Sequence, residues 1–278
     1  MGTDYRNNRT VGYAMKSYLY GFILNLQFLS IIPFPMEVPM EKKNIERSVQ
    51  MFPVLGLIQG IIYAGSFYLL LEWTHLSALA IAFIIWLLCI ILTGGLHLDG
   101  WMDSSDAYFS YRKKEDRLRI MEDANIGAFG VLSVIVLLAT RFLFIYEVIL
   151  MANFLTCFFL FVIPFFGKIL MGMMLTKVPL AKEKGMAYFY REATQPKTLW
   201  IYPFYIIIVL AVGSLLSMEL LPFLLIMLFI TYIMFILLRR RALKWFGGIT
   251  GDVTGASVEG AETFLWMIVW LLHYFAMG

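Results

Sequence analysis

Long apolar runs separated by short polar segments dominate the pattern along the chain. Runs without Asp, Glu, Lys or Arg cover residues 17–36, 48–71, 73–98, 148–167, 198–218, 220–238 and 263–278. A helix crosses a bilayer with about 20 mostly apolar residues, whereas a barrel strand would show strict alternation of apolar and polar positions. The pattern therefore predicts an all-α fold, a polytopic membrane helical bundle that forms a single domain over residues 1–278.

Composition strengthens this prediction and excludes a soluble domain. Hydrophobic residues make up 61% of the chain, charged residues make up 15%, and the mean hydropathy is +0.79. Soluble domains average about 25% charged residues. The net charge of +3 is small, and we expect no nucleic acid as a partner. Cys89 and Cys157 both lie inside apolar runs and do not indicate a disulfide framework.

Basic residues predict the topology. Nearly all of the 22 Lys and Arg residues fall in a few groups, while the connections around Glu72, Glu147 and Glu219 carry acids and no basic residue. Cytoplasmic loops retain Lys and Arg, which makes the segments 37–47, 99–123, 177–197 and 239–262 the expected cytoplasmic loops. About seven transmembrane helices follow, at residues 48–71, 76–98, 124–146, 148–176, 198–218, 220–238 and 263–277.

The run at 17–36 does not fit this topology. A span there would place the basic N-terminus outside, and the run contains Asn25, Gln27, Pro33 and Pro35. We therefore predict an N-terminal interfacial or re-entrant helix. A true span, giving eight in all, is the alternative.

Carboxylates gather in the stretch TGGLHLDGWMDSSDAYFS at 93–110. Asp99, Asp103 and Asp106 are spaced i, i+4 and i+7 and share one face of a helix. A divalent cation, with Mg²⁺ as the natural choice, would relieve their repulsion. A solvated acidic face at a helix start is the alternative, but Asp99 directly follows an apolar run, where an unpaired carboxylate is unfavourable. A cation site is therefore preferred.

A second acidic stretch, FGGITGDVTGASVEGAETF, covers 246–264. Asp252, Glu259 and Glu262 would share a helical face just before the last span. The pattern GG[LI]xxD occurs in both stretches, either by chance or as an internal repeat. Two glycine-containing, acid-bearing segments on one side of the membrane predict a shared metal site.

Single polar residues within or beside the apolar runs are further candidates. By helix rise, Arg141 would lie near the outer surface, whereas Lys168 would lie toward the cytoplasmic side, where it could neutralise a phosphate. His97 could be a metal ligand, a proton carrier or a packing residue. Arg119 belongs to a basic run that either holds a phosphate or only marks the cytoplasmic side. Gly127 and Gly130 in a helix opening indicate close packing or close approach of a ligand.

Four pieces of sequence carry a family resemblance. They are FLSIIPFP at 28–35, TGGLHLDGWMDSSDA at 93–107, RIMEDANIGAFGV at 119–131 and GGITGDVTGASVEGAE at 247–262. In this order they resemble the cobalamin synthase family, the adenosylcobinamide-GDP ribazoletransferases, which are polytopic membrane enzymes.

The resemblance implies an activity and a location. It implies a Mg²⁺-dependent transferase that joins adenosylcobinamide-GDP to alpha-ribazole, or to alpha-ribazole 5'-phosphate, and releases GMP. The enzyme would be a multi-pass protein of the cell inner membrane with its active site facing the cytoplasm, and it could associate with copies of itself.

The resemblance and the spacing together assign the site residues. Metal ligands are expected at Asp99, Asp103 and Asp252. The expected catalytic residues are these three with Asp106 and Lys168, and either Asp106 or Asp252 would act as the base. Substrate-binding roles are expected for His97, Arg119, Asp123, Arg141, Glu259 and Glu262. The family often has Lys and then Arg where this chain has Arg141 and Lys168, which leaves the geometry of a bidentate contact open.

Two other functions remain as alternatives. A CDP-alcohol phosphotransferase also uses aspartates on membrane helices, but Asp103 and Ser104 stand where its DGxxAR motif has Ala and Arg. A cation transporter would carry its acids near the midplane of the bilayer, whereas these acids are expected at loop edges.

Overall fold

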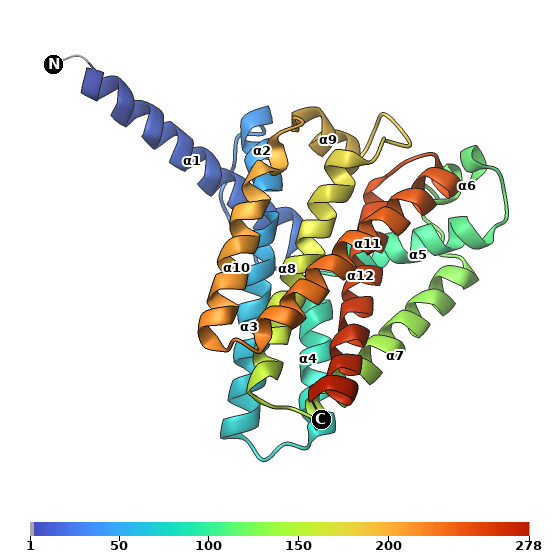
Figure 1. Ribbon diagram of the computed structural model, residues 1–278. Coiled ribbons are helices and arrows are strands. Elements are labelled where there is room, and N and C mark those ends of the chain that lie inside the picture. The colour runs from blue at the N-terminus through green and yellow to red at the C-terminus, as the bar shows by residue number, and fades with distance from the viewer. Residues whose placement is uncertain (1–2, 278) are drawn as a thin grey trace.

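The architecture is a bundle of helices (Figure 1). The computed structural model describes residues 3–277, with side chains described from Met15 to Phe275 except Phe154. Within this range no strand forms, and a single backbone bridge joins Leu180 to Ile249, so the predicted all-α class is confirmed. The elements are α1 (Thr3–Leu29), α2 (Lys42–Gln50), α3 (Phe52–Trp73), α4 (Ala78–Leu92), α5 (Leu96–Phe109), α6 (Lys114–Ile120), α7 (Ala128–Leu150), α8 (Phe154–Lys177), α9 (Met186–Ala193), η1 (Thr198–Ile201), α10 (Tyr202–Leu216), α11 (Leu220–Phe246), α12 (Gly251–Leu272) and η2 (His273–Met277).

The long apolar helices make the chain a multi-pass membrane protein. Among the described residues, five helical segments are long and apolar enough to cross a membrane: α3, α7, α8, η1 with α10, and α11. The bent pair of α4 and α5 would give a sixth. The last predicted span corresponds to α12, which begins at Gly251 instead of residue 263 and includes Asp252, Glu259 and Glu262. The number of seven spans stays a prediction.

The centre of the bundle is α8, which lies between α3 and α12 (Figure 1). Two glycines of α3, spaced by four residues, allow the two backbones to approach closely. A Cβ at Gly56 would lie 2.6 Å from the carbonyl oxygen of Pro164, and one at Gly60 would collide with the carbonyl of Phe161. Most of α8 is therefore enclosed by other helices.

Both glycine-containing acidic stretches form sharp turns between helices. The axis changes direction by 83° between α4 and α5, where Gly94 and Gly95 have φ of 64° and 76°. Gly247 ends α11 with φ of 80° before the chain enters α12. Left-handed backbone of this kind favours glycine. Since α4 runs along the bundle, the bend directs α5 across its end.

The first helix is longer than predicted. It begins at Thr3 and ends at Leu29, before Pro33 and Pro35, and it projects away from the bundle (Figure 1). Its last turns pack on α2, where the Asn25 side-chain amide donates to the Ser48 carbonyl at 2.9 Å. This helix is not among those long and apolar enough to cross a membrane. Its location at the membrane surface stays a prediction.

Candidate active site

Three carboxylates converge where α5 crosses α12. Gly100 packs directly on the backbone of Asp252, since a Cβ there would lie 2.7 Å from the Asp252 carbonyl oxygen. This contact brings Asp252 beside the face of α5 that carries Asp99 and Asp103. Partial burial, followed by the charges of Asp99, Asp252 and Asp106, raises the pKa of Asp103 to about 6. The predicted cluster of like charges is therefore present, on a helix that turns away from the spanning direction of α4.

The chemistry of this donor set fits Mg²⁺ that is shared with a substrate. Among the described residues, no group of three or more His, Cys, Asp or Glu side chains is arranged to hold a metal ion by itself. Magnesium commonly takes one or two carboxylates and completes its coordination with water and phosphate oxygens. Asp99 is exposed, and Asp103 and Asp252 are partly exposed. All three therefore remain accessible to a phosphate-bearing ligand.

Asp106 holds the start of α7, a structural role that its spacing in the sequence did not indicate. Its carboxylate accepts hydrogen bonds from the backbone amides of Gly127 at 2.8 Å and Gly130 at 2.7 Å. It thus binds the N-terminal turn of α7, where free amides and the helix dipole favour a negative charge. A Cβ at either glycine would collide with the carboxylate. This geometry favours a positioning role over the predicted role as a base, and it explains the two glycines.

Arg141 does not extend to the surface of the bundle as a snorkelling side chain would, although its depth in the membrane stays a prediction. It is 2% exposed, and its Nη2 lies 2.6 Å from Oε2 of Glu259. The same guanidinium donates to the Glu259 carbonyl at 2.9 Å, and its Nε donates to Oγ1 of Thr263 at 2.9 Å. The burial of Arg141 was missed because the last span was predicted to start at residue 263, which left Glu259 in a loop. Because α12 begins at Gly251, a countercharge for Arg141 lies within the bundle.

Lys168 and Glu262 add a second pair of opposite charges to this buried region. Lys168 is fully buried, and Glu262 is 8% exposed. Glu262 lies against α8 beside Lys168, because a Cβ at Gly167 would collide with its carboxylate. The Lys168 ammonium has no hydrogen-bond partner among the described residues. Lys168 therefore lies within the bundle with Glu262, and not on the exposed face with Asp99 and Asp103.

His97 connects the two regions. Its Nδ1 lies 4.0 Å from Oε1 of Glu259, and both ring nitrogens lack a hydrogen-bond partner in the described part of the chain. The same side chain lines a small cavity of about 90 Å³ together with Asp99, Asp252 and Gly255. One residue thus contacts both the cavity at the carboxylates and the buried ion pair.

Two predicted site residues lie at the exposed end of α6: Arg119 in its last turn and Asp123 in the connection that follows. Arg119 pairs with Asp116 at 3.6 Å. The carboxylate of Asp123 accepts from the backbone and side-chain nitrogens of Asn125 at 3.0 and 2.7 Å, and these hydrogen bonds lower its pKa. Neither residue is among those that line the cavity beside Asp99. Their predicted role in substrate binding stays a prediction.

Thr263 and Gly100 were not singled out from the sequence, although each is important for the site. Thr263 lies four residues after Glu259, so both face Arg141 from one side of α12. That spacing of two polar residues in an apolar helix was an available signal. Gly100 carried no comparable signal, since its importance depends on which helix crosses α5 at that residue.

Comparisons with known proteins agree with the resemblance. The family model described as Cobalamin-5-phosphate synthase matches residues 21–270. An adenosylcobinamide-GDP ribazoletransferase of Geobacillus sp. (strain WCH70) is 37% identical over 263 residues, which covers 95% of this chain and 100% of that protein. Proteins of the same name from Geobacillus thermodenitrificans and Halalkalibacterium halodurans are 37% and 33% identical, over 95% and 92% of this chain and 100% and 97% of their own lengths. No solved structure matches the chain.

Proposed function

We infer the reaction of this chain from the family to which it belongs, the cobalamin-5-phosphate synthases. The chain is a membrane transferase of cobalamin biosynthesis that joins adenosylcobinamide-GDP to alpha-ribazole, or to alpha-ribazole 5'-phosphate, and releases GMP. Relatives named for this activity are similar to the chain along nearly its whole length. Family membership favours this function over a CDP-alcohol phosphotransferase and over a cation transporter.

The observation that supports the chemistry is the convergence of Asp99, Asp103 and Asp252 on one exposed face. Displacement of GMP by a ribose hydroxyl is phosphoryl transfer, in which catalysis depends on positioning and on neutralising charge at phosphate oxygens. One or two of these carboxylates would hold Mg²⁺, which supplies that neutralisation when it is bound. Uncompensated carboxylates would otherwise repel a pyrophosphate.

The residues of the chain then orient the substrates. His97 borders the cavity beside Asp99 and Asp252, so it is positioned to hydrogen-bond a substrate group there. Glu259, held by Arg141 and Thr263, fixes the side of the cavity that His97 occupies. Lys168 adds positive charge beneath this region, within the bundle.

An activity assay with the purified protein tests this proposal. The protein in detergent is incubated with adenosylcobinamide-GDP, alpha-ribazole and Mg²⁺, and chromatography follows GMP and the complete corrinoid. Equal amounts of both products are expected, with none when alpha-ribazole is omitted. Formation of GMP alone would indicate a hydrolase, and turnover that a chelator leaves unchanged would contradict the metal.

We also propose that the carboxylates face the cytoplasm at the inner membrane. Tyr111, after α5, is 82% exposed, and Trp73, at the far end of α3, is 80% exposed, so both positions suit labelling. After Cys89 and Cys157 are replaced by Ala, an impermeant thiol reagent added to intact cells should label Trp73→Cys and not Tyr111→Cys. The reverse pattern would contradict this orientation.

A further inference from the structure

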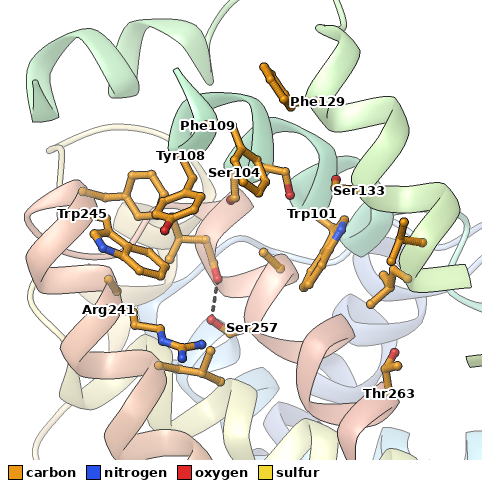
Figure 2. A pocket seen from close by; sticks show the side chains of 18 of the residues that line it. Trp101, Ser104, Tyr108, Phe109, Phe129, Ser133, Arg241, Trp245, Ser257 and Thr263 are labelled. Atoms are coloured by element: carbon orange, nitrogen blue, oxygen red, sulfur yellow. Dashed lines mark hydrogen bonds between the residues drawn. The ribbon is translucent and has the colours of Figure 1, made fainter. Parts of the chain in front are cut away.

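A large cleft lies on the side of α5 opposite the carboxylates. It has a volume of about 680 Å³ and is bordered by α5, α7, α11 and α12 (Figure 2). Helical spacing places Trp101 and Tyr108, which line it, on the face of α5 opposite Asp99 and Asp103. A ligand in this cleft is therefore separated from Asp99 and Asp103 by the helix itself, although Thr263, which binds Arg141, also lines the cleft.

The cleft has an apolar wall that faces the surroundings of the bundle. Leu132 and Val136 of α7 line it and are 58% and 64% exposed. They belong to a helix that is long and apolar enough to cross a membrane. This part of the cleft therefore opens outward from the bundle along an apolar helix face, the kind of face that lipid covers.

The other part of the cleft has the residues typical of a membrane boundary. Arg241, Trp245 and Tyr108 lie together there (Figure 2). The Arg241 guanidinium is 5.7 Å from the Trp245 ring centre, and the ring centres of Tyr108 and Trp245 are 4.2 Å apart. Aromatic rings and Arg side chains are common where hydrocarbon meets lipid headgroups.

The basic residues and unpaired polar atoms of the cleft indicate the chemistry of its ligand. The last turns of α11 contain Arg239, Arg240, Arg241 and Lys244, and this helix contains no acid. Basic pockets between membrane helices bind anionic headgroups. Ser104, 8% exposed, and the indole nitrogen of Trp101 have no hydrogen-bond partner among the described residues, and both side chains line the cleft. An indole N–H needs an acceptor, and the ester carbonyls of a diacyl lipid are acceptors.

We propose that this cleft is a binding site for an anionic phospholipid. The phosphate lies at Arg241, the ester carbonyls lie near Trp101 and Ser104, and one acyl chain follows Leu132 and Val136. Binding of this lipid holds α7 and α11 apart below α5. The proposal does not depend on the substrates of the transferase.

Competition between lipids tests the site. The purified full-length protein in non-ionic detergent binds phosphatidylglycerol that carries a fluorescent acyl chain, and unlabelled lipids displace it. Phosphatidylglycerol should displace the probe at roughly one-fifth of the concentration that phosphatidylcholine needs, as expected for one basic residue at a lipid phosphate. Arg241→Gln should abolish this preference. Arg239→Gln, a matched change in the same turn that lies outside the cleft lining, should preserve it.

A second variant separates cleft binding from general contact with lipid. Ala256 lines the cleft from α12, so Ala256→Trp should reduce probe binding at least tenfold in protein that still elutes as a folded species. If this variant does not fold, the comparison of Arg239→Gln with Arg241→Gln still tests the proposal. Equal displacement by both lipids, displacement by inorganic phosphate, or equal effects of Arg239→Gln and Arg241→Gln would each overturn the proposal.

Discussion

The exposed carboxylates and the buried ionic residues differ in charge balance. Among the described residues, Asp99, Asp103 and Asp252 form no salt bridge, and partial burial together with the neighbouring carboxylates raises the pKa of Asp103. In the buried region, Arg141 is paired with Glu259 at 2.6 Å, and Lys168 lies beside Glu262. Carboxylates without a countercharge attract a cation and a substrate, whereas paired buried charges hold helices together. We therefore expect mutations in the first region to affect turnover and mutations in the second to affect stability.

The largest effect is expected at the exposed carboxylates. Asp99→Asn and Asp103→Asn should each reduce Mg²⁺-dependent turnover by roughly a hundredfold to a thousandfold, comparable with removing one group that stabilises a transition state. Thermal unfolding in detergent should hardly change, because Asp99 is exposed and Asp103 is partly exposed. Titration of Mg²⁺ into each variant provides the check. Full activity at the magnesium concentration used for the unmodified protein would show that Asp99 and Asp103 are not part of the active site.

Breaking the buried ion pair should destabilise the protein strongly. Arg141→Gln leaves Glu259 as an uncompensated charge, and such losses are about 3–5 kcal/mol. The temperature at which the protein loses its monodisperse gel-filtration peak should fall sharply. The double variant Arg141→Met with Glu259→Gln, which carries neither charge, should regain part of the loss. A single variant as stable as the unmodified protein would show that the pair does not hold α7 on α12.

Lys168 tests whether the two regions cooperate. Lys168→Met keeps a side chain of similar length but leaves Glu262 beside it without its countercharge, so the protein should become less stable. If Lys168 provides positive charge for the phosphates above it, turnover should fall about tenfold, which corresponds to about 1.4 kcal/mol. Glu262→Gln is the matched control on the facing helix. Unchanged turnover in Lys168→Met would make this residue purely structural.

The smallest effect is expected at Asp106. Asp106→Asn keeps one acceptor oxygen for the amides of Gly127 and Gly130 but loses the negative charge at the start of α7, so a loss of about 0.5–2 kcal/mol is expected. Turnover per folded molecule should remain within a few fold of the original value, measured at a temperature where both proteins are folded. A hundredfold loss of turnover with normal stability would show instead that Asp106 takes part in catalysis.

The sequence predicted the helical bundle and the family, because uncharged runs and four motifs are properties of the chain read in order. It also predicted that Asp99, Asp103 and Asp252 would lie near one another, as they do where α5 crosses α12; that they form one metal site stays a prediction. It did not predict that Asp106 binds α7, since that contact depends on where the next helix begins. The burial of Arg141 was missed for a related reason. Hydropathy placed the start of the last span after Glu262, whereas α12 already begins at Gly251. Glu259 is thereby enclosed beside Arg141, in an arrangement that depends on how α7 and α12 pack.

The enclosed position of α8 has a consequence for how the protein is made. Lys168 lies at its centre, and the helix with the compensating Glu262 is synthesised last among the long helices. During translation α8 therefore enters the bilayer before its countercharge exists, and a lysine in hydrocarbon is unfavourable. The charge of Lys168 is therefore compensated only once α12 has joined the bundle, which makes the packing of α12 on α8 a late step of assembly.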